Sequence, residues 1–294
     1  MRELIRDQGI LEVEKLPFWT GPIKIWPLTG GITNRNYGVQ DADGQRYAVR
    51  LGQDIPRHGV MRFNEQTAAQ AAAKAGISPK IMYTAPGVMI SRLLPGRTLT
   101  QDEIRQPENL ARIVELLRRC HGEMAKHLHG PLLAFWVFQI NRAYAASLGD
   151  DGPLAGELER LCALNEALEQ RVGKVNIVYA HNDLLAGNIF DDGARLWLLD
   201  WDYAGFNTPL FDLANLSSNN GFFPTDDATL LELYLDAAPD AHTLDAFKAL
   251  KCASLLRETL WSAVSEKFST IAFDYAAYTR DNLSRLNVAI ADLG

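Results

Sequence analysis

Hydrophobic and polar residues alternate over short stretches of the first 95 residues, and this period of two predicts β-strands. Five strands are expected, at residues 23–28, 36–40, 46–51, 80–83 and 88–92. The turns Asp41-Ala42-Asp43-Gly44 and Pro86-Gly87 would join neighbouring strands as hairpins. Residues 61–75 are rich in Ala and Gln and lack Gly and Pro, so they predict a helix that ends at Gly76. Together these elements predict a small lobe of mixed strands and helix.

The pattern changes after Leu94-Pro95-Gly96, where apolar residues recur at three- and four-residue steps and indicate amphipathic helices. Helices are expected at residues 107–126, 154–172, 244–265 and 270–288. A short strand-rich island is expected between them, at residues 176–180, 189–190 and 195–199. We therefore predict an α+β fold of two lobes, a β-rich lobe at residues 1–94 and a larger, mainly helical lobe at residues 95–294.

Composition restricts the classes of protein that fit this pattern. The chain has 294 residues, of which 47% are hydrophobic and 22% charged, so it can bury a sizeable core. Its net charge of −7 argues against nucleic acid as a partner, because binding a polyanion depends on clustered Lys and Arg. The three cysteines, Cys120, Cys162 and Cys252, are far apart and suit reduced thiols in a reducing compartment.

The sequence also predicts a soluble, cytoplasmic protein. Residues 1–16 are charged throughout and lack the apolar segment of a signal peptide. The longest apolar run, residues 131–138, is far shorter than the roughly 20 residues that a membrane-spanning helix needs. No membrane span is therefore expected, and the oligomeric state stays open, with a dimer as one option.

The strongest chemical signal is the segment His181-Asn182-Asp183-Leu184-Leu185-Ala186-Gly187-Asn188, which follows an apolar strand. It has the spacing H-x-D-x4-N of a kinase catalytic loop, and Asp200 ends the next apolar strand, followed by Trp201 and Asp202. Phosphoryl transfer needs an acceptor hydroxyl held in line and a divalent cation to neutralise phosphate charge. We therefore expect a kinase-like fold that uses ATP and Mg²⁺.

Each residue of this segment is assigned a role. Asp183 would orient the hydroxyl and take its proton, and Asn188 and Asp200 would supply oxygen ligands to Mg²⁺. His181 is grouped with Asp183 in the catalytic loop and is expected to brace the loop by hydrogen bonding rather than to transfer protons. Asp202 is expected beside the metal or the substrate ammonium. Asp212 is expected to cap a helix or brace the loop.

The predicted nucleotide site matches kinase patterns less closely. Arg50 stands in Tyr47-Ala48-Val49-Arg50 where kinases place a Lys, and Glu65, fifteen residues on, could pair with it. A surface Arg and a solvated Glu are the alternative. The Gly-Gly turn before the hairpin would let the backbone approach phosphate, or it is a simple turn. The nucleotide-binding candidates are therefore Gly30, Gly31, Thr33, Asn34, Arg50 and Glu65.

The chain resembles the choline/ethanolamine kinases, a branch of the protein-kinase-like fold shared with aminoglycoside phosphotransferases. The resemblance runs from about Leu28 to Asn287. Its segments are GGITNRNYGV at 30–39, YAVRLG at 47–52, LPGRTL at 94–99, HNDLLAGNIF at 181–190, LLDWDYAGFNTPLFDLAN at 198–215 and FDYAAY at 273–278. The resemblance implies that Arg is the family's usual residue at position 50, and that Trp261 matches a tryptophan of the family's choline cage.

The acceptor is the least determined part of the prediction. A quaternary ammonium is recognised by aromatic faces and carboxylates, and the substrate candidates are Trp201, Tyr203, Glu258 and Trp261. Tyr275 and Tyr278 are also aromatic, although ordinary core packing accounts for them. The family often carries a second tryptophan where this chain has Glu258, which could accept hydrogen bonds from a primary ammonium.

The leading hypothesis is phosphorylation of choline or a similar small amino alcohol by Mg-ATP. Ethanolamine, thiamine or an aminoglycoside is the alternative acceptor on the same fold, although the C-terminal helices offer few acids for a polycationic aminoglycoside. The alternative outside the enzymes is a kinase-like binding module without catalytic activity. The presence of Asp183, Asn188 and Asp200 argues against it.

Overall fold

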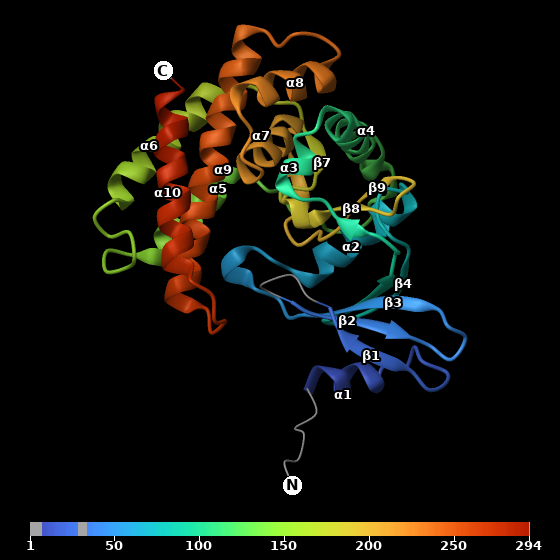
Figure 1. Ribbon diagram of the computed structural model, residues 1–294. Helices are drawn as coiled ribbons and strands as arrows, with labels where there is room; N and C mark the ends of the chain where they lie inside the picture. The colour runs from blue at the N-terminus through green and yellow to red at the C-terminus, as the bar shows by residue number, and fades with distance from the viewer. Residues whose placement is uncertain (1–7, 29–33, 294) are drawn as a thin grey trace.

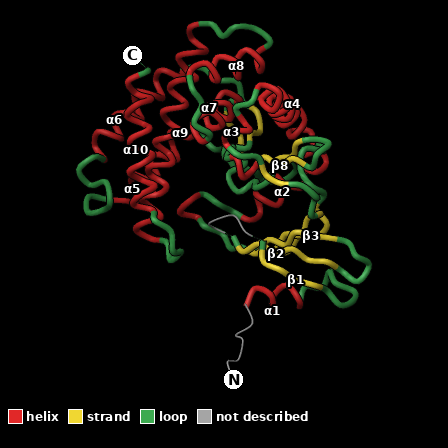
Figure 2. Tube along the Cα trace, in the orientation of Figure 1, coloured by secondary structure: helices red, strands yellow, loops and turns green. Residues whose placement is uncertain are grey.

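The computed structural model describes residues 8–28 and 34–293, and it has a strand-rich part and a helical part (Figures 1 and 2). The strand-rich part contains a five-stranded antiparallel sheet in the order β1-β2-β3-β5-β4. Its elements are α1 (Gln8–Glu14), β1 (Lys24–Pro27), β2 (Arg35–Gln40), β3 (Arg46–Leu51), α2 (Arg62–Lys74), β4 (Ile81–Ala85) and β5 (Val88–Arg92). The five predicted strands and the predicted helix are confirmed to within two residues at each end. The sequence did not predict α1.

Strand β3 shows how the residue pattern builds the two faces of this sheet. Tyr47, Val49 and Leu51 are buried in a cluster with Val13 of α1, which covers the outer face (Figure 1). Because successive side chains of a strand point to opposite faces, Arg50 lies on the inner face, toward the helical part. The alternation that predicts the strand therefore also determines which face Arg50 occupies.

Residues 93–96 connect β5 of the strand-rich part to β6 (Arg97–Thr98), and the lobe boundary after residue 94 stays a prediction. Gly96 has a φ of +130°, and a Cβ at this position would collide with the carbonyl oxygen of Asp191. Only glycine tolerates both the backbone conformation and the close approach. This connection brings β6 into a three-stranded sheet with β8 (Ile189–Asp191) and β9 (Leu196–Leu198).

The helical part surrounds α9 (Ala241–Phe268), which packs against four other helices. Figure 1 shows α9 and α10 side by side, running from the C-terminal end of the chain toward the sheet. The elements of this part are α3 (Gln101–Ile104), α4 (Pro107–Glu123), α5 (Val137–Leu148), α6 (Leu158–Val172), β7 (Val178–Ala180), β10 (Gly205–Asn207), α7 (Pro209–Asn219), α8 (Pro224–Leu235) and α10 (Tyr275–Ala291). The predictions of α4, α6, α9 and α10 and of the strand-rich island are confirmed.

Helices α3, α5, α7 and α8 were not predicted, and α7 shows why. Residues 211–219 are all buried, including Asp212, Asn215 and Ser217. A helix that is enclosed on every side has no polar face, so its sequence lacks the amphipathic period from which helices are recognised. Its buried polar side chains serve the neighbouring loop instead. In the described residues, no helix is both long and apolar enough to cross a membrane.

Candidate active site

The loop after β7 is held rigidly by buried side chains of α7. The carboxylate of Asp212 accepts hydrogen bonds from the backbone N–H groups of His181 (2.9 Å) and Asn182 (2.7 Å). It also lies 3.0 Å from Nε2 of His121. Burial would raise the pKa of Asp212, but the hydrogen bond and charge of His121 outweigh burial and lower it. The carboxylate therefore stays ionised and braces the loop, as the sequence suggested.

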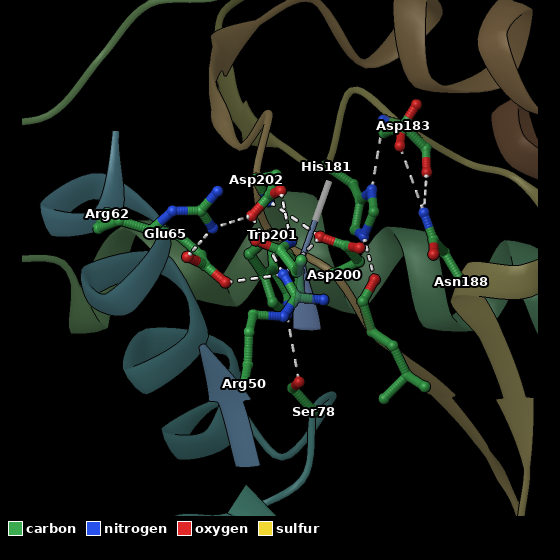
Figure 3. A network of polar contacts seen from close by, with 12 residues as sticks. Arg50, Arg62, Glu65, Ser78, His181, Asp183, Asn188, Asp200, Trp201 and Asp202 are labelled. Carbon is green, nitrogen blue, oxygen red and sulfur yellow. Dashed lines mark hydrogen bonds and ion pairs between the residues drawn. The ribbon is translucent and has the colours of Figure 1, made fainter. Parts of the chain in front are cut away.

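His181 is the first residue of this loop and is fully buried. Its Nε2 is 2.9 Å from the carbonyl oxygen of Leu199, and its Nδ1 accepts a hydrogen bond from the backbone N–H of Asp183 at 3.3 Å (Figure 3). These contacts connect the loop to the strand that leads to Asp200. The geometry therefore gives His181 a bracing role, with no exposed ring nitrogen to exchange protons with a substrate.

Asp183, Asn188 and Asp200 lie on one large cavity between the strand-rich and helical parts. The side-chain amide of Asn188 donates to the carbonyl oxygen of Asp183 at 2.8 Å, which leaves the amide oxygen for another partner (Figure 3). Burial raises the pKa of Asp183 to about 6, with Arg257 opposing this shift and Glu258 and Asp200 adding to it. A carboxylate with this pKa is ionised at neutral pH and close enough to neutrality to accept a proton.

Opposite the loop, Arg50 of β3 is held by three carboxylates. Its Nη1 lies 2.7 Å from Glu65, 2.8 Å from Asp200 and 3.1 Å from Asp202 (Figure 3). Burial would lower the pKa of Arg50, but these carboxylates raise it well above its ordinary value. For Asp200 the burial effect is likewise outweighed, and Arg50 lowers the pKa of this carboxyl. The predicted pairing of Arg50 with Glu65 is present.

A second arginine, Arg62 at the start of α2, joins the same network. Its Nη1 lies 2.5 Å from Glu65 and 2.8 Å from Asp202, and its Nε donates to the carbonyl oxygen of Gln53. The sequence analysis did not identify Arg62. Its signal was available, because an Arg three residues before a Glu in a helix lies on the same face.

The predicted nucleotide-binding residues are only partly within the described chain. Gly30, Gly31 and Thr33 lie outside it. Asn34 is described, and its amide donates to Asp202 at 3.0 Å. Its buried Oδ1 has no hydrogen-bond partner among the described residues.

The oxygen-rich set around Asp200 fits a Mg²⁺ site. Mg²⁺ prefers hard oxygen ligands and usually takes only one or two protein carboxylates, with water and phosphate oxygens completing its shell. Asp200 is 24% exposed in its side chain, and the amide oxygen of Asn188 has no hydrogen-bond partner among the described residues, so both offer such ligands on the cavity. No group of three or more His, Cys, Asp or Glu side chains within the described ranges forms a complete metal site by itself. This donor set therefore suits a cation that arrives with phosphate.

The far end of the cavity is aromatic. The indole N–H of Trp261 donates to the hydroxyl of Tyr203 at 3.0 Å, and the ring of Trp261 lies 6.3 Å from that of Tyr278 at an interplanar angle of 76°. The hydroxyl of Tyr278 donates to Glu258 at 3.2 Å. Tyr203, Glu258, Trp261 and Tyr278 all line the cavity, whose volume is about 920 Å³. Tyr278, assigned to core packing from the sequence, therefore also faces the site.

Trp201 does not belong to this aromatic group. It is 1% exposed, its indole N–H donates to Ser78 Oγ at 3.2 Å, and its ring lies 4.7 Å from that of His181. These contacts pack Trp201 against the catalytic loop, and it also lines the cavity, so its role at the acceptor stays a prediction. Tyr203 and Trp261 contact each other directly, and Tyr278 links Trp261 to Glu258.

Arg257, which also lines the cavity, was not identified from the sequence. It is 2% exposed, and its Nη1 contacts both Glu258 and the carboxylate of Asp183, the latter at 3.1 Å. The signal in the sequence was a charged pair, Arg257-Glu258, inside the apolar segment Leu255–Val264 of α9. Charged residues are rarely buried unless they are paired, so such a pair in a buried helix indicates a functional site.

A strand-rich lobe carrying an Arg–Glu pair, above a loop with Asp183 and Asn188 and a facing Asp200, defines a phosphotransferase of the protein-kinase-like fold. The family model described as choline/ethanolamine kinase matches residues 25–248, which is most of the chain. The chain therefore belongs to the choline/ethanolamine kinase family and is a small-molecule kinase.

Individual relatives agree with this membership. Protein LicA of Haemophilus influenzae is 26% identical over a match that covers 88% of this chain and 97% of that protein. Ethanolamine kinase 2 of Mus musculus is 29% identical, covering 84% of this chain and 71% of its own length. A crystal structure of a choline/ethanolamine kinase family protein from Mesorhizobium loti superposes with a TM-score of 0.80 at 26% identity, covering 97% of this chain and 94% of the other.

Proposed function

We propose that this protein transfers the γ-phosphoryl group of ATP, with Mg²⁺, to the hydroxyl of choline or a similar small amino alcohol. The observation that supports this most directly is the position of Asp183. Its carboxylate lines the same cavity as Asn188 and Asp200, the predicted oxygen ligands, and as the aromatic group of Tyr203, Trp261 and Tyr278. A hydroxyl bound there lies next to a base and opposite the phosphate site.

In this proposal, Asp183 accepts the proton of the acceptor hydroxyl while the oxygen attacks the γ-phosphorus. The bond from phosphorus to the bridging oxygen breaks, and ADP leaves with that oxygen. Arg50, which pairs with Glu65 and Asp200, would contact the phosphates when the nucleotide is bound. Asn188 and Asp200 would hold Mg²⁺, which would supply charge neutralisation at the phosphates.

The aromatic end provides recognition of the ammonium. A trimethylammonium group cannot donate hydrogen bonds, so the faces of Trp261 and Tyr278 and the charge of Glu258 would hold it. Glu258 also favours a second candidate acceptor, ethanolamine. Glu258 is 6% exposed and lines the cavity, where its carboxylate can accept hydrogen bonds from a primary ammonium.

The test is ADP release with Mg-ATP against choline, ethanolamine, thiamine and kanamycin in parallel. We expect turnover with choline or ethanolamine well above the other two, and the better of the pair shows whether the aromatic faces or Glu258 dominates recognition. Asp183→Asn should lower turnover at least roughly 100-fold while ATP binding persists, because the base is lost. Asp281→Asn, at an exposed position of α10, is the matched control and should keep wild-type activity. Near-normal turnover by Asp183→Asn would overturn the assignment.

A further inference from the structure

Arg257 holds the catalytic carboxylate from the acceptor side of the cavity. Its Nη1 donates to Oδ1 of Asp183 at 3.1 Å. The side-chain amide of Asn188 donates to the backbone carbonyl oxygen of the same residue. The guanidinium carbon also lies 4.3 Å from the ring centroid of Tyr203. Arg257 is therefore fixed by a base and by an aromatic face at once.

The same guanidinium neutralises Glu258, the other acid at this end of the cavity. Nη1 of Arg257 contacts Oε1 of Glu258, and the remaining oxygen of Glu258 accepts the hydroxyl of Tyr278 at 3.2 Å. Burial would lower the pKa of Arg257, but Glu258 and Asp183 raise it well above its ordinary value, so the side chain stays charged. Its Nε is buried without a partner within residues 8–28 and 34–293, so charge rather than a full set of hydrogen bonds holds it in place.

Charges at the two ends of the cavity serve different partners. Arg50, Asp200 and Asp202 lie at the end where phosphate and Mg²⁺ would bind. Among the charged side chains that line the cavity, Arg257 contacts Asp183 and Glu258, and these three form the charged group next to the aromatic side chains. His58, near Trp261, has a pKa lowered to about 4 by burial and by the charges of Arg257 and Arg57, so it is neutral at pH 7. Two negative charges and one positive charge leave a net charge of −1.

We propose that Arg257 is a positioning and specificity-determining residue that sets the acceptor end of the cavity to a net charge of −1, matched to an alcohol with a single positive charge. This inference rests on the proposed function. A monocation brings the acceptor end to neutrality, while a dication leaves an excess positive charge against buried Arg257. A neutral alcohol leaves the carboxylates without their counter-charge.

Arg257 also explains why an acid is tolerated among the aromatic side chains. Without the guanidinium, Glu258 and Asp183 would be two like charges on one cavity with no cation between them to offset their repulsion. With it, Asp183 stays available as a base and Glu258 stays available to the ammonium. A small amino alcohol fits this arrangement better than an aminoglycoside, which carries several ammonium groups.

The test compares three alcohols on each enzyme variant: choline, its neutral isostere 3,3-dimethyl-1-butanol, and a bis-quaternary analogue in which one methyl carries a second trimethylammonium. If ethanolamine is the better substrate, ethanolamine and 1-propanol replace the first two. The readout is the ratio of kcat/KM values between alcohols on the same preparation, which a partly unfolded variant does not change. A unit charge a few ångströms away in a partly buried site should shift this ratio roughly tenfold or more.

The expected shifts have opposite directions. Arg257→Met makes the site −2 and should raise the ratio of dication to monocation at least about tenfold, while Glu258→Gln makes it neutral and should raise the ratio of neutral alcohol to monocation by a similar factor. The double variant returns to −1 and should again prefer the monocation. Arg257→Lys keeps the charge and should keep the wild-type order, with kcat partly recovered relative to Arg257→Met.

Ratios that stay within about twofold of wild type in both single variants would overturn the inference, as would a double variant that keeps the shift of either single one. If Arg257→Met does not fold, Glu258→Gln and Arg257→Lys still decide the question. Calorimetric binding of the same three alcohols separates this inference from the proposed function. Binding with the predicted charge preference but without phosphate transfer would contradict the kinase assignment of the site and leave the charge match standing.

Discussion

Replacement of His58 by Phe should remove part of the acid sensitivity of the fold. His58 ends the short 3-10 turn Pro56–His58 and is 8% exposed, with its ring 5.5 Å from that of Trp261 and 5.7 Å from that of Tyr144. Its Nε2 lies 3.3 Å from Ser265 Oγ, and its Nδ1 is buried without a hydrogen-bond partner in the described chain. Burial, together with the charges of Arg257 and Arg57, lowers the pKa of His58 from 6.5 to about 4.

The direction of the pH dependence follows from this lowered pKa. Above pH 6.5 the imidazole is neutral in the folded and unfolded chains, and its titration leaves the stability unchanged. Between pH 6.5 and about 4 the unfolded chain takes up a proton that the folded chain refuses, so stability falls with pH. At pH 5 this loss amounts to about 2 kcal/mol relative to pH 7.5.

The assay is urea unfolding followed by tryptophan fluorescence at pH 7.5 and pH 5. His58→Phe keeps an aromatic ring in the cluster and should lose about 2 kcal/mol less than wild type between these pH values. His129→Asn, at an exposed position, is the matched control and should behave as wild type. Equal losses in wild type and His58→Phe would refute the reasoning, because they would show that His58 is protonated in the folded protein.

Two further predictions concern the loop and the connection between the lobes. Asp212→Asn should lower the free energy of unfolding by about 3 kcal/mol and reduce turnover at least roughly tenfold. The reason is that the buried N–H groups of the catalytic loop lose an ionised acceptor. Unchanged urea midpoints and kcat would contradict this prediction. Gly96→Ala should cost at least about 2 kcal/mol because of its positive φ and the collision with Asp191, whereas Gly122→Ala on α4, with open space around its Cβ, should be neutral or slightly stabilising in the same unfolding experiment.

The strands of the sheet could be predicted because their pattern is local. In β3, alternate residues face the outer core and the cavity, and the sequence shows this directly. The same holds for α9, whose apolar residues mark most of its length. Helix α7 could not be predicted, because a fully buried helix carries polar residues for its neighbours rather than for solvent.

In the candidate site, too, residues close in sequence could be predicted and contacts between distant residues could not. Asp183 and Asn188 share one loop, so their spacing identified them. The contact between Asp183 and Arg257 joins residues 74 positions apart, and the contact between Arg62 and Asp202 joins residues 140 positions apart. Each contact joins a helix to a distant loop, and no local period in the sequence records it. The aromatic side chains posed the same difficulty. Trp201 and Trp261 are the same residue type, and the sequence does not show that only Trp261 joins the aromatic group at the far end of the cavity.

Asp183 should act as the base in transfer of phosphate to an amino-alcohol hydroxyl. Phosphorus-31 NMR of a reaction with Mg-ATP and choline or ethanolamine tests it most directly, because it separates a phosphate ester from free phosphate. We predict a new phosphomonoester signal that grows as the γ-phosphate signal declines, and at least roughly 100-fold slower growth with Asp183→Asn. Release of inorganic phosphate alone, or an equal rate with Asp183→Asn, would contradict the account.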